Sequence, residues 1–262
     1  MAPVSPALRA LLVNLVDYAG LFPPAALSLP IAGENYARYL RSENAWMLGR
    51  FVIPAAQLRQ LQNTDGWRIT VLSDSEVTAP DLPIESVESR TLRRFSLPAY
   101  YEIAIDDADA LSALQEMRAY AKIRTGGLTP DSIPSTAAIA RFLRACAELR
   151  LPFKATAGLH HPVRSEHPLT YDANAPRATM HGFVNVFLAA AFAWQGAEES
   201  QIVDVLNESD PGAFRFDERA HWRDASLSAQ QLADTRRHFA HNFGSCSFDE
   251  PVADLRRLGW LP

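Results

Sequence analysis

Short runs of strand-forming residues recur eight times along this chain, and helical patterns fill most of the gaps between them. The runs are rich in β-branched or aromatic residues and are bounded by Pro, Gly, Asp or Ser, which is typical of strands. Strands that alternate with helices form parallel sheets, and eight of them predict a closed (β/α)8 barrel, the TIM barrel. The expected strands span residues 14–19, 48–54, 67–73, 84–90, 99–105, 120–125, 152–158 and 242–248.

Apolar residues at helical spacing favour the same α/β fold. A helix over 5–13 is expected to precede the barrel. The segment 159–241, between the seventh and eighth strands, is too long for an ordinary crossover, so we predict that this helical insertion contributes a lid or cap. The other expected helices span 33–43, 107–118, 135–149, 179–195, 197–208, 227–240 and 249–258.

An open doubly wound sheet is the alternative architecture. It is disfavoured because no Gly-x-Gly-x-x-Gly turn follows the first expected strand. The chain has 262 residues, which suits one barrel, and 48% of them are hydrophobic, as expected for a globular protein with a large core. We therefore predict a single domain over residues 1–262.

Composition excludes several classes of protein. The net charge is −5 and no segment carries a basic stripe, so nucleic-acid binding is not expected. Asn14 and Asp17 interrupt the apolar run near the N-terminus, which predicts neither a signal peptide nor a membrane span. Two cysteines, Cys146 and Cys246, are too few for a disulfide framework, so a cytoplasmic location is expected.

Lysine is almost absent from this chain. There are two lysines, Lys122 and Lys154, against 23 arginines. Both lie in short apolar runs on the sixth and seventh expected strands, which are neighbours in a barrel. Arginine keeps its proton and is no amine nucleophile, whereas a desolvated lysine can react as a free amine. The two lysines are therefore the first candidates for chemistry.

Alternation along the strands places Lys122 with Arg124 on one face, and Lys154 with Thr156 on one face. If these faces point inward, two amines and a guanidinium meet inside the barrel. A cation beside a lysine lowers its pKa, so we expect one of these lysines to be a free amine near neutral pH. Such an amine can attack a carbonyl carbon and form a Schiff base.

Carboxylates on the preceding strands complete this cluster. Glu88 and Glu102 lie on the fourth and fifth expected strands and can offset the lysine charges. One interpretation is a buried ion network that only closes the barrel. The other is catalytic, with Glu102 or Glu88 transferring protons at the carbon next to the Schiff base.

Three short motifs resemble the class I aldolases of the deoxyribose-phosphate aldolase type. Those enzymes are (β/α)8 barrels with a Schiff-base lysine in a Lys-x-[Ser/Thr]-Thr-Gly run on strand six. They carry a second lysine in a Lys-x-x-Gly-Gly run on strand seven and a Gly-x-Ser-Ser turn after strand eight. The corresponding residues here are Lys122 with Thr125, Gly126 and Gly127, then Lys154 with Gly158, then Gly244, Ser245 and Ser247.

The resemblance implies that Lys122 is the nucleophile and Lys154 the neighbour that lowers its pKa. It also implies that the turn after strand eight offers backbone N–H groups to an anionic end of the substrate. Two positions and one segment depart from the family pattern, and the segment is the long 159–241 insertion, which has no counterpart there. Arg124 replaces a small residue beside the nucleophile, which suggests a substrate carboxylate rather than a sugar phosphate, and Ala157 replaces a glycine.

Histidines supply a second set of candidates. His160 and His161 directly follow the seventh strand, and His181 opens the expected helix 179–195 with Asn185 one turn beyond it. These residues can act in acid/base catalysis or substrate binding. The three histidines, completed by Glu88 or Glu102, are also candidate ligands of a divalent metal ion.

Two further residues have open roles. Asp17 ends the first strand and is either a substrate-binding or catalytic carboxylate or a cap of the turn. Cys246 is either a nucleophile or a small residue in a tight turn. The apolar stripe of 180–194 predicts core packing or a contact in a homo-oligomer.

Our first hypothesis is a lyase of the aldolase type. It would act on a small anionic carbonyl compound, such as an oxo-acid, through a lysine Schiff base and without a cofactor. A metal-dependent lyase, isomerase or hydrolase that uses the histidines and glutamates is the second. A non-catalytic barrel that binds an anion is the third, and it predicts that arginine can replace either lysine.

Overall fold

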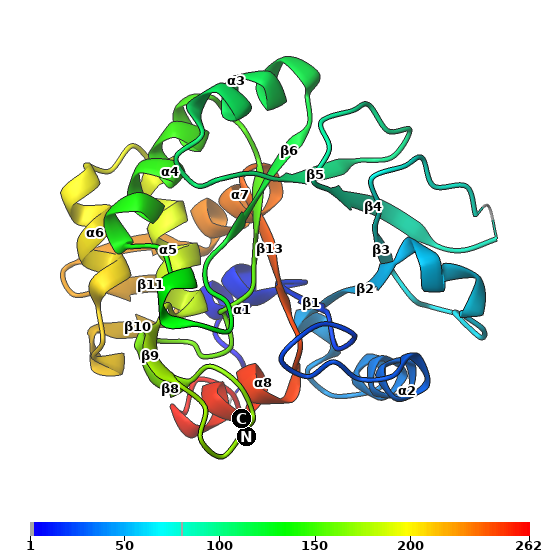
Figure 1. Ribbon diagram of the computed structural model, residues 1–262. Helices are drawn as coiled ribbons and strands as arrows, with labels where there is room; N and C mark the ends of the chain where they lie inside the picture. Colours follow the sequence, from blue (N-terminus) through cyan, green and yellow to red (C-terminus); the bar gives the residue numbers. More distant parts are fainter. Residues whose placement is uncertain (1–2, 80) are drawn as a thin grey trace.

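The computed structural model describes residues 3–79 and 81–262, and within them eight parallel strands close into a barrel (Figure 1). The predicted (β/α)8 fold is therefore confirmed. Around the barrel the strands follow the order β1-β13-β7-β6-β5-β4-β3-β2. The barrel strands are β1 (Val16–Tyr18), β2 (Leu48–Pro54), β3 (Ile69–Leu72), β4 (Ile84–Ser89), β5 (Ala99–Glu102), β6 (Tyr120–Arg124), β7 (Phe153–Thr156) and β13 (Ala240–Ser245).

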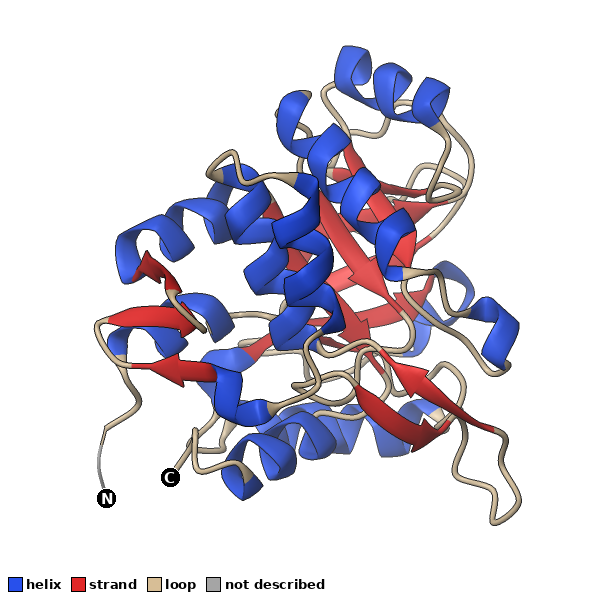
Figure 2. Cartoon of the chain, turned by 90° about the vertical axis from the view of Figure 1, so that its left-hand side faces the viewer, coloured by secondary structure: helices blue, strands red, loops and turns tan. Residues whose placement is uncertain are grey.

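Helices surround these strands, as Figure 2 shows from the side. The first, α1, begins at Pro6, whose fixed φ suits a first helical turn, and the Ser5 hydroxyl accepts a hydrogen bond from the Leu8 N–H. It packs against α7. The helices are α1 (Pro6–Leu12), α2 (Leu29–Leu40), α3 (Ala108–Met117), α4 (Thr136–Glu148), α5 (Phe183–Trp194), α6 (Glu199–Asn207), α7 (Ala229–His238) and α8 (Asp249–Arg257). Short 3₁₀ turns cover η1 (Ala45–Met47), η2 (Ala55–Gln60), η3 (Pro130–Ser132) and η4 (Pro211–Ala213).

The long segment between β7 and β13 has two parts. Its first part carries a hairpin of β8 (Ser165–Pro168) and β9 (Arg177–Met180). Its second part holds α5, α6, α7 and an antiparallel sheet of β10 (Phe214–Phe216), β11 (Arg219–Trp222) and β12 (Ala225–Ser228). Helix α5 is buried along nearly its whole length because it packs against α4, α6, α7 and β13. It therefore belongs to the outer layer of the barrel. The predicted lid or cap concerns the first part of the segment, from which His160, Leu169 and Met180 line the cavity described below.

The predicted helix 179–195 starts too early. Residues 177–180 form β9, and α5 begins only at Phe183. A Cβ on Gly182 would lie 2.3 Å from Asn185 Oδ1 and 2.4 Å from the carbonyl oxygen of Pro162. Gly182 is extended and packs closely on its neighbours, so the helix begins only after it and His181 lies outside the helix. None of the helices within the described residues has the length and hydropathy that a membrane span requires.

The inside of the barrel is unusually polar. Such interiors are normally filled by branched apolar side chains. Here Asp17, Glu88, Lys122, Lys154 and Asn242 are all nearly fully buried. The strand register places Glu102 beside Lys122 and Lys122 beside Lys154 across β5, β6 and β7. The apolar core lies mainly outside the strands, under the helices, so the inside is available for a site.

Candidate active site

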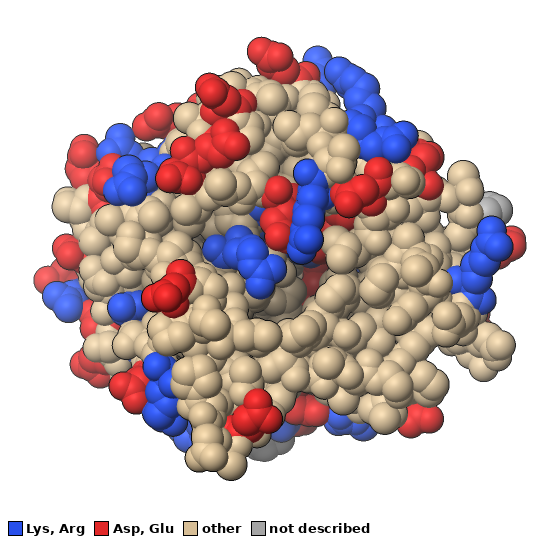
Figure 3. Space-filling model, viewed as in Figure 1, with Lys and Arg blue, Asp and Glu red and all other residues tan. Residues whose placement is uncertain are grey.

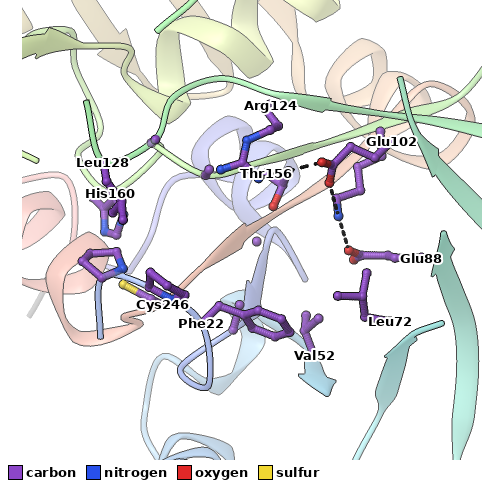
Figure 4. Close-up of a pocket in the computed structure, with 18 of the residues that line it drawn as sticks. Phe22, Val52, Leu72, Glu88, Glu102, Arg124, Leu128, Thr156, His160 and Cys246 are labelled. Atoms are coloured by element: carbon purple, nitrogen blue, oxygen red, sulfur yellow. Dashed lines mark ion pairs between the residues drawn. The ribbon is translucent and has the colours of Figure 1, made fainter. Parts of the chain in front are cut away.

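A cavity of about 320 Å³ lies at the carboxyl ends of the barrel strands. Figure 3 shows a hollow near the centre of this face, bordered by charged side chains of both signs, and Figure 4 shows its wall. This is the end at which (β/α)8 enzymes build their active sites. The residues that line it are Ala19, Phe22, Pro23, Pro24, Val52, Leu72, Glu88, Arg90, Glu102, Lys122, Arg124, Gly127, Leu128, Thr156, Ala157, Gly158, His160, Leu169, Met180, Gly244 and Cys246.

The two lysines have different surroundings. Lys122 lines the cavity, and its Nζ lies 2.7 Å from Glu88 Oε2 and 2.9 Å from Glu102 Oε2. Lys154 lies behind the wall, with its Nζ 2.5 Å from Glu88 Oε1 and 2.6 Å from Asp17 Oδ2. They are 4% and 1% exposed, respectively. Lys122 is therefore the amine that a molecule in the cavity can reach.

Glu88 bridges the two lysines. Burial favours its protonated form, but the adjacent Lys122 and Lys154 ammonium groups outweigh burial and lower the pKa of Glu88 to about 2. Burial likewise disfavours the ammonium form of Lys154, and the Asp17 and Glu88 carboxylates outweigh it and raise the pKa of Lys154. We expected two cations facing each other, but a carboxylate lies between them. Glu88 therefore offsets the repulsion between the two ammonium groups, and that repulsion is what was expected to lower the pKa of a lysine.

Asp17 is fixed from three sides. Its Oδ2 pairs with Lys154, and its Oδ1 accepts hydrogen bonds from the Arg50 N–H at 2.7 Å and the Asn242 amide at 3.2 Å. A Cβ on Gly49 would lie 2.2 Å from Asp17 Oδ1, so only glycine leaves room for this carboxylate. Asp17 therefore belongs to the buried charge network and does not line the cavity. The sequence analysis did not identify Gly49 or Asn242. Asn242 could have been found, because it lies two residues before Gly244 on the last strand and so shares its face.

Two arginines stand at the mouth of the cavity near Glu102. The distance to Glu102 Oε1 is 3.6 Å from Arg90 Nε and 3.9 Å from Arg124 Nη1. The Arg124 side chain is 49% exposed, whereas Glu102 is only 14% exposed. In Figure 4, Arg124, Thr156 and Glu102 lie on one side of the cavity, and Phe22, Val52 and Leu72 lie on the other. The cavity thus has a charged side and an apolar side.

The loops after β6 and β7 touch backbone to backbone. A Cβ on Gly126 would lie 2.8 Å from the Cα of Gly158, and Thr125 Oγ1 donates to the carbonyl oxygen of Ala157 at 2.6 Å. Of the expected residues here, Gly127 and Thr156 line the cavity, whereas Thr125 and Gly126 join the two loops. Ala157 has a φ of +57°, so it keeps the left-handed conformation that glycine adopts more readily.

The turn after β13 contributes fewer groups than expected. Gly244 and Cys246 line the cavity. Ser245 is buried, and its carbonyl oxygen accepts a hydrogen bond from the Ala19 N–H at 2.7 Å. Ser247 Oγ accepts from the Glu250 N–H at 3.2 Å, at the start of α8. Both serines therefore hold the local backbone.

The structure separates the candidate histidines. His160 lines the cavity and its Nδ1 lies 2.9 Å from Glu250 Oε2. His161 Nδ1 is hydrogen-bonded to Asp254 Oδ2 at 2.5 Å. The ring of His161 stacks on His167 with 3.4 Å between centroids.

His181 and Asn185 lie away from the cavity. His181 Nε2 is hydrogen-bonded to the Pro134 carbonyl oxygen at 2.8 Å, and the residue is 1% exposed. Asn185 accepts from the Arg164 N–H and donates to two carbonyl oxygens, so it serves the packing of α5. The expected three-histidine cluster therefore does not form. Among residues 3–79 and 81–262, no group of three or more His, Cys, Asp or Glu side chains is arranged to hold a metal ion.

The chain was compared with protein-family models, with curated proteins and with solved structures, and none of them matched. The resemblance of the three motifs to aldolases stays a prediction. Function must therefore be inferred from the geometry of the site.

Proposed function

We propose that this protein is a lyase of the aldolase type that forms a Schiff base between Lys122 and a small anionic carbonyl compound. The observation that carries the proposal is the position of the Lys122 amine. It is buried in the wall of a cavity at the catalytic end of the barrel, between Glu88 and Glu102. A carbonyl compound that enters the cavity can therefore meet this amine.

Charge conservation favours a Schiff base at this position. An ammonium and a carbonyl group give a protonated imine and one water molecule, so the nitrogen carries one positive charge before and after the reaction. Glu88 and Glu102 therefore keep their counter-charge throughout, and no buried carboxylate is left unpaired. A neutral product at this nitrogen would lose that compensation.

Glu102 is the proposed proton carrier. It contacts Lys122 and is 14% exposed, whereas Glu88 is buried with a pKa lowered to about 2 by the two lysines. Glu102 takes a proton from the ammonium, which frees the amine to attack, and returns it to the carbinolamine oxygen, which leaves as water. In the lyase step it takes the hydroxyl proton of the departing fragment. The electrons of the broken carbon–carbon bond then move into the imine and form an enamine.

Arg124 and Arg90 are the proposed binding groups for a substrate carboxylate. Exposed guanidinium groups at the mouth suit a planar anion. The wall of Phe22, Val52 and Leu72 suits a short aliphatic part. A volume of about 320 Å³ restricts the substrate to a small molecule. The proposal includes a cytoplasmic location, which the two buried free cysteines suit.

Reductive trapping tests the proposal. The protein is incubated with a panel of 2-oxo acids and matched neutral aldehydes, reduced with borohydride, and examined by intact mass and peptide mapping. We expect an adduct on Lys122 and none in Lys122→Arg. Arg124→Ala should weaken trapping of the oxo acids more than that of the aldehydes. An adduct on Lys154, or no adduct with any compound, would contradict the assignment.

A barrel that binds an anion without chemistry is the second candidate. The complete pairing of both lysines favours it, because each Nζ contacts two carboxylates. In that case Lys122→Arg should bind the same oxo acids with unchanged affinity. Isothermal titration calorimetry of the wild type and this variant separates the two functions.

A further inference from the structure

A second cavity, of about 520 Å³, opens at the other end of the barrel. Its wall comes from the amino ends of the strands and from the end of α7, and includes Asn14, Tyr100, Tyr120 and His241. We call it the lower cavity. It shares no lining residue with the candidate active site.

Positive charge dominates the lower cavity. Arg50, Arg68, Arg236 and Arg237 line it, and Glu85 is the only carboxylate among the described lining residues. Glu85 is shared, since Arg50 Nε and Arg68 Nε lie 2.8 Å and 2.9 Å from its two oxygens. The wall therefore carries an excess of guanidinium groups.

Arg236 is the most unusual of them, because it is 8% exposed. Its guanidinium group donates to the backbone carbonyl oxygens of Leu11, Val13, Ala240 and His241. No carboxylate of residues 3–79 or 81–262 lies within ion-pair distance of it, so its N–H groups are satisfied but its charge is not balanced by a contacting anion. Burial lowers the pKa of this group to about 9, although Asp17 acts against that shift. Asp17 is itself paired with Lys154. An anion bound in the lower cavity would therefore stabilise the buried charge of Arg236.

Asn242 adds a second, independent observation. It lines the lower cavity and is 2% exposed. Its amide nitrogen donates to Asp17 Oδ1, which fixes the orientation of the side chain. Its Oδ1 has no hydrogen-bond partner within the described part of the chain. Buried amide oxygens are nearly always satisfied, so this atom lacks a donor.

We propose that the lower cavity binds a small oxyanion that also carries an O–H group, as monohydrogen phosphate and hydroxycarboxylates do. The guanidinium groups of the wall balance its charge, and its hydroxyl donates to Asn242 Oδ1. Both features belong to the same ligand chemistry, since an ion without a donor would leave Asn242 unsatisfied. The site does not depend on the proposed aldolase activity.

Calorimetric titration with inorganic phosphate and with sulfate at equal ionic strength tests the proposal. Both are tetrahedral oxyanions, but sulfate has no O–H group at neutral pH. We expect one phosphate per chain, bound about tenfold more tightly than sulfate, which corresponds to about 1.4 kcal/mol. In Asn242→Leu this preference should fall to about unity. Arg68→Ala should weaken both ions about fivefold or more, whereas Arg141→Ala, on the exposed face of α4, should change neither.

Crystals soaked in arsenate give a second measurement that needs no variant. Arsenate shares the charge and O–H group of phosphate, and its anomalous peak should lie between Asn242 and Arg236. Hydroxycarboxylate titrations then distinguish the organic from the inorganic ligand. The proposal is overturned if no saturable binding occurs, if phosphate and sulfate bind equally, or if Arg124→Ala rather than Arg68→Ala removes binding. An arsenate peak confined to the upper cavity would also overturn it.

Discussion

The two ends of the barrel interior carry charge in opposite ways. At the carboxyl end, Lys122 and Lys154 are interleaved with Asp17, Glu88 and Glu102, so that each amine contacts two carboxylates. At the amino end, four arginines line a cavity in which Glu85 is the only carboxylate among the described lining residues. Lysine, which can release its proton, lies at the end where we propose that the chemistry takes place. Arginine, which cannot, is placed where a lasting positive charge remains uncompensated.

The largest expected effect comes from breaking the charge network at its most buried point. Lys154→Met leaves Asp17 and half of Glu88 without a counter-charge, and we expect it to lower the free energy of unfolding by about 3–5 kcal/mol. Lys122→Met should lower it by roughly half as much, because Glu102 is partly exposed and lies near two arginines. Urea unfolding of both variants measures the difference. Equal losses would contradict the distinction between the two lysines.

Acid should weaken the ion pairs at the carboxyl end of the barrel, whereas the arginines at the amino end keep their charge. The pKa of Glu88 is lowered from 4.5 to about 2, so its contribution is complete above pH 4.5 and is lost as the pH falls towards 2. The loss is on the order of 3 kcal/mol. Unfolding free energies measured across this range should show it, and Glu88→Gln should flatten that part of the profile. A wild-type profile that is flat from pH 5 to 2 would contradict the ion pairs.

A single methyl group should distinguish the site from the outer layer. Gly49→Ala places a Cβ 2.2 Å from Asp17 Oδ1, so we expect it to displace the carboxylate and to destabilise the protein by about 1–3 kcal/mol. Gly33→Ala in α2 is the matched control. Its Cβ would lie 3.5 Å from Trp67, and the change should stabilise the helix by about 0.5–1 kcal/mol. Thermal unfolding of both variants gives the signs.

The smallest expected effect concerns the loop after β7. Ala157 has a φ of +57°, and Ala157→Gly relieves this strain. We expect a gain of about 0.5–1 kcal/mol, because the relief is partly offset by the greater freedom of glycine in the unfolded chain. Differential scanning calorimetry is sensitive enough to detect it. A loss of stability would mean that the Ala157 methyl group makes contacts that outweigh the strain.

Periodicity predicted the fold well because it reports local preferences that the barrel also satisfies. The runs around Lys122 and Lys154 became β6 and β7, and the register brings the two residues side by side. Periodicity failed at 179–195, because it cannot separate the end of strand β9 and the extended Gly182 from the apolar helix that follows them.

The candidate site was predictable only in its outline. Scarcity singled out the lysines, and strand alternation singled out Glu88 and Glu102. The bridging position of Glu88 depends on side-chain directions across three strands, which no local pattern encodes. Likewise, the room that Gly49 leaves for Asp17 is a contact between β2 and β1. The adjacency of His160 and His161 suggested one shared site, but each is hydrogen-bonded to a different carboxylate of α8.

Because lysine is nearly absent, chemical labelling of amines can report on access to the cavity. The positive side chains on its surface are arginines, so reagents that acylate or reductively methylate amines find no lysine on the outside. Of the two lysines, Lys122 is the one that borders a cavity, and only reagents small enough to enter the cavity can reach it. The rate of its labelling therefore measures entry, and a compound that slows the labelling can be recognised as a ligand before any reaction is known.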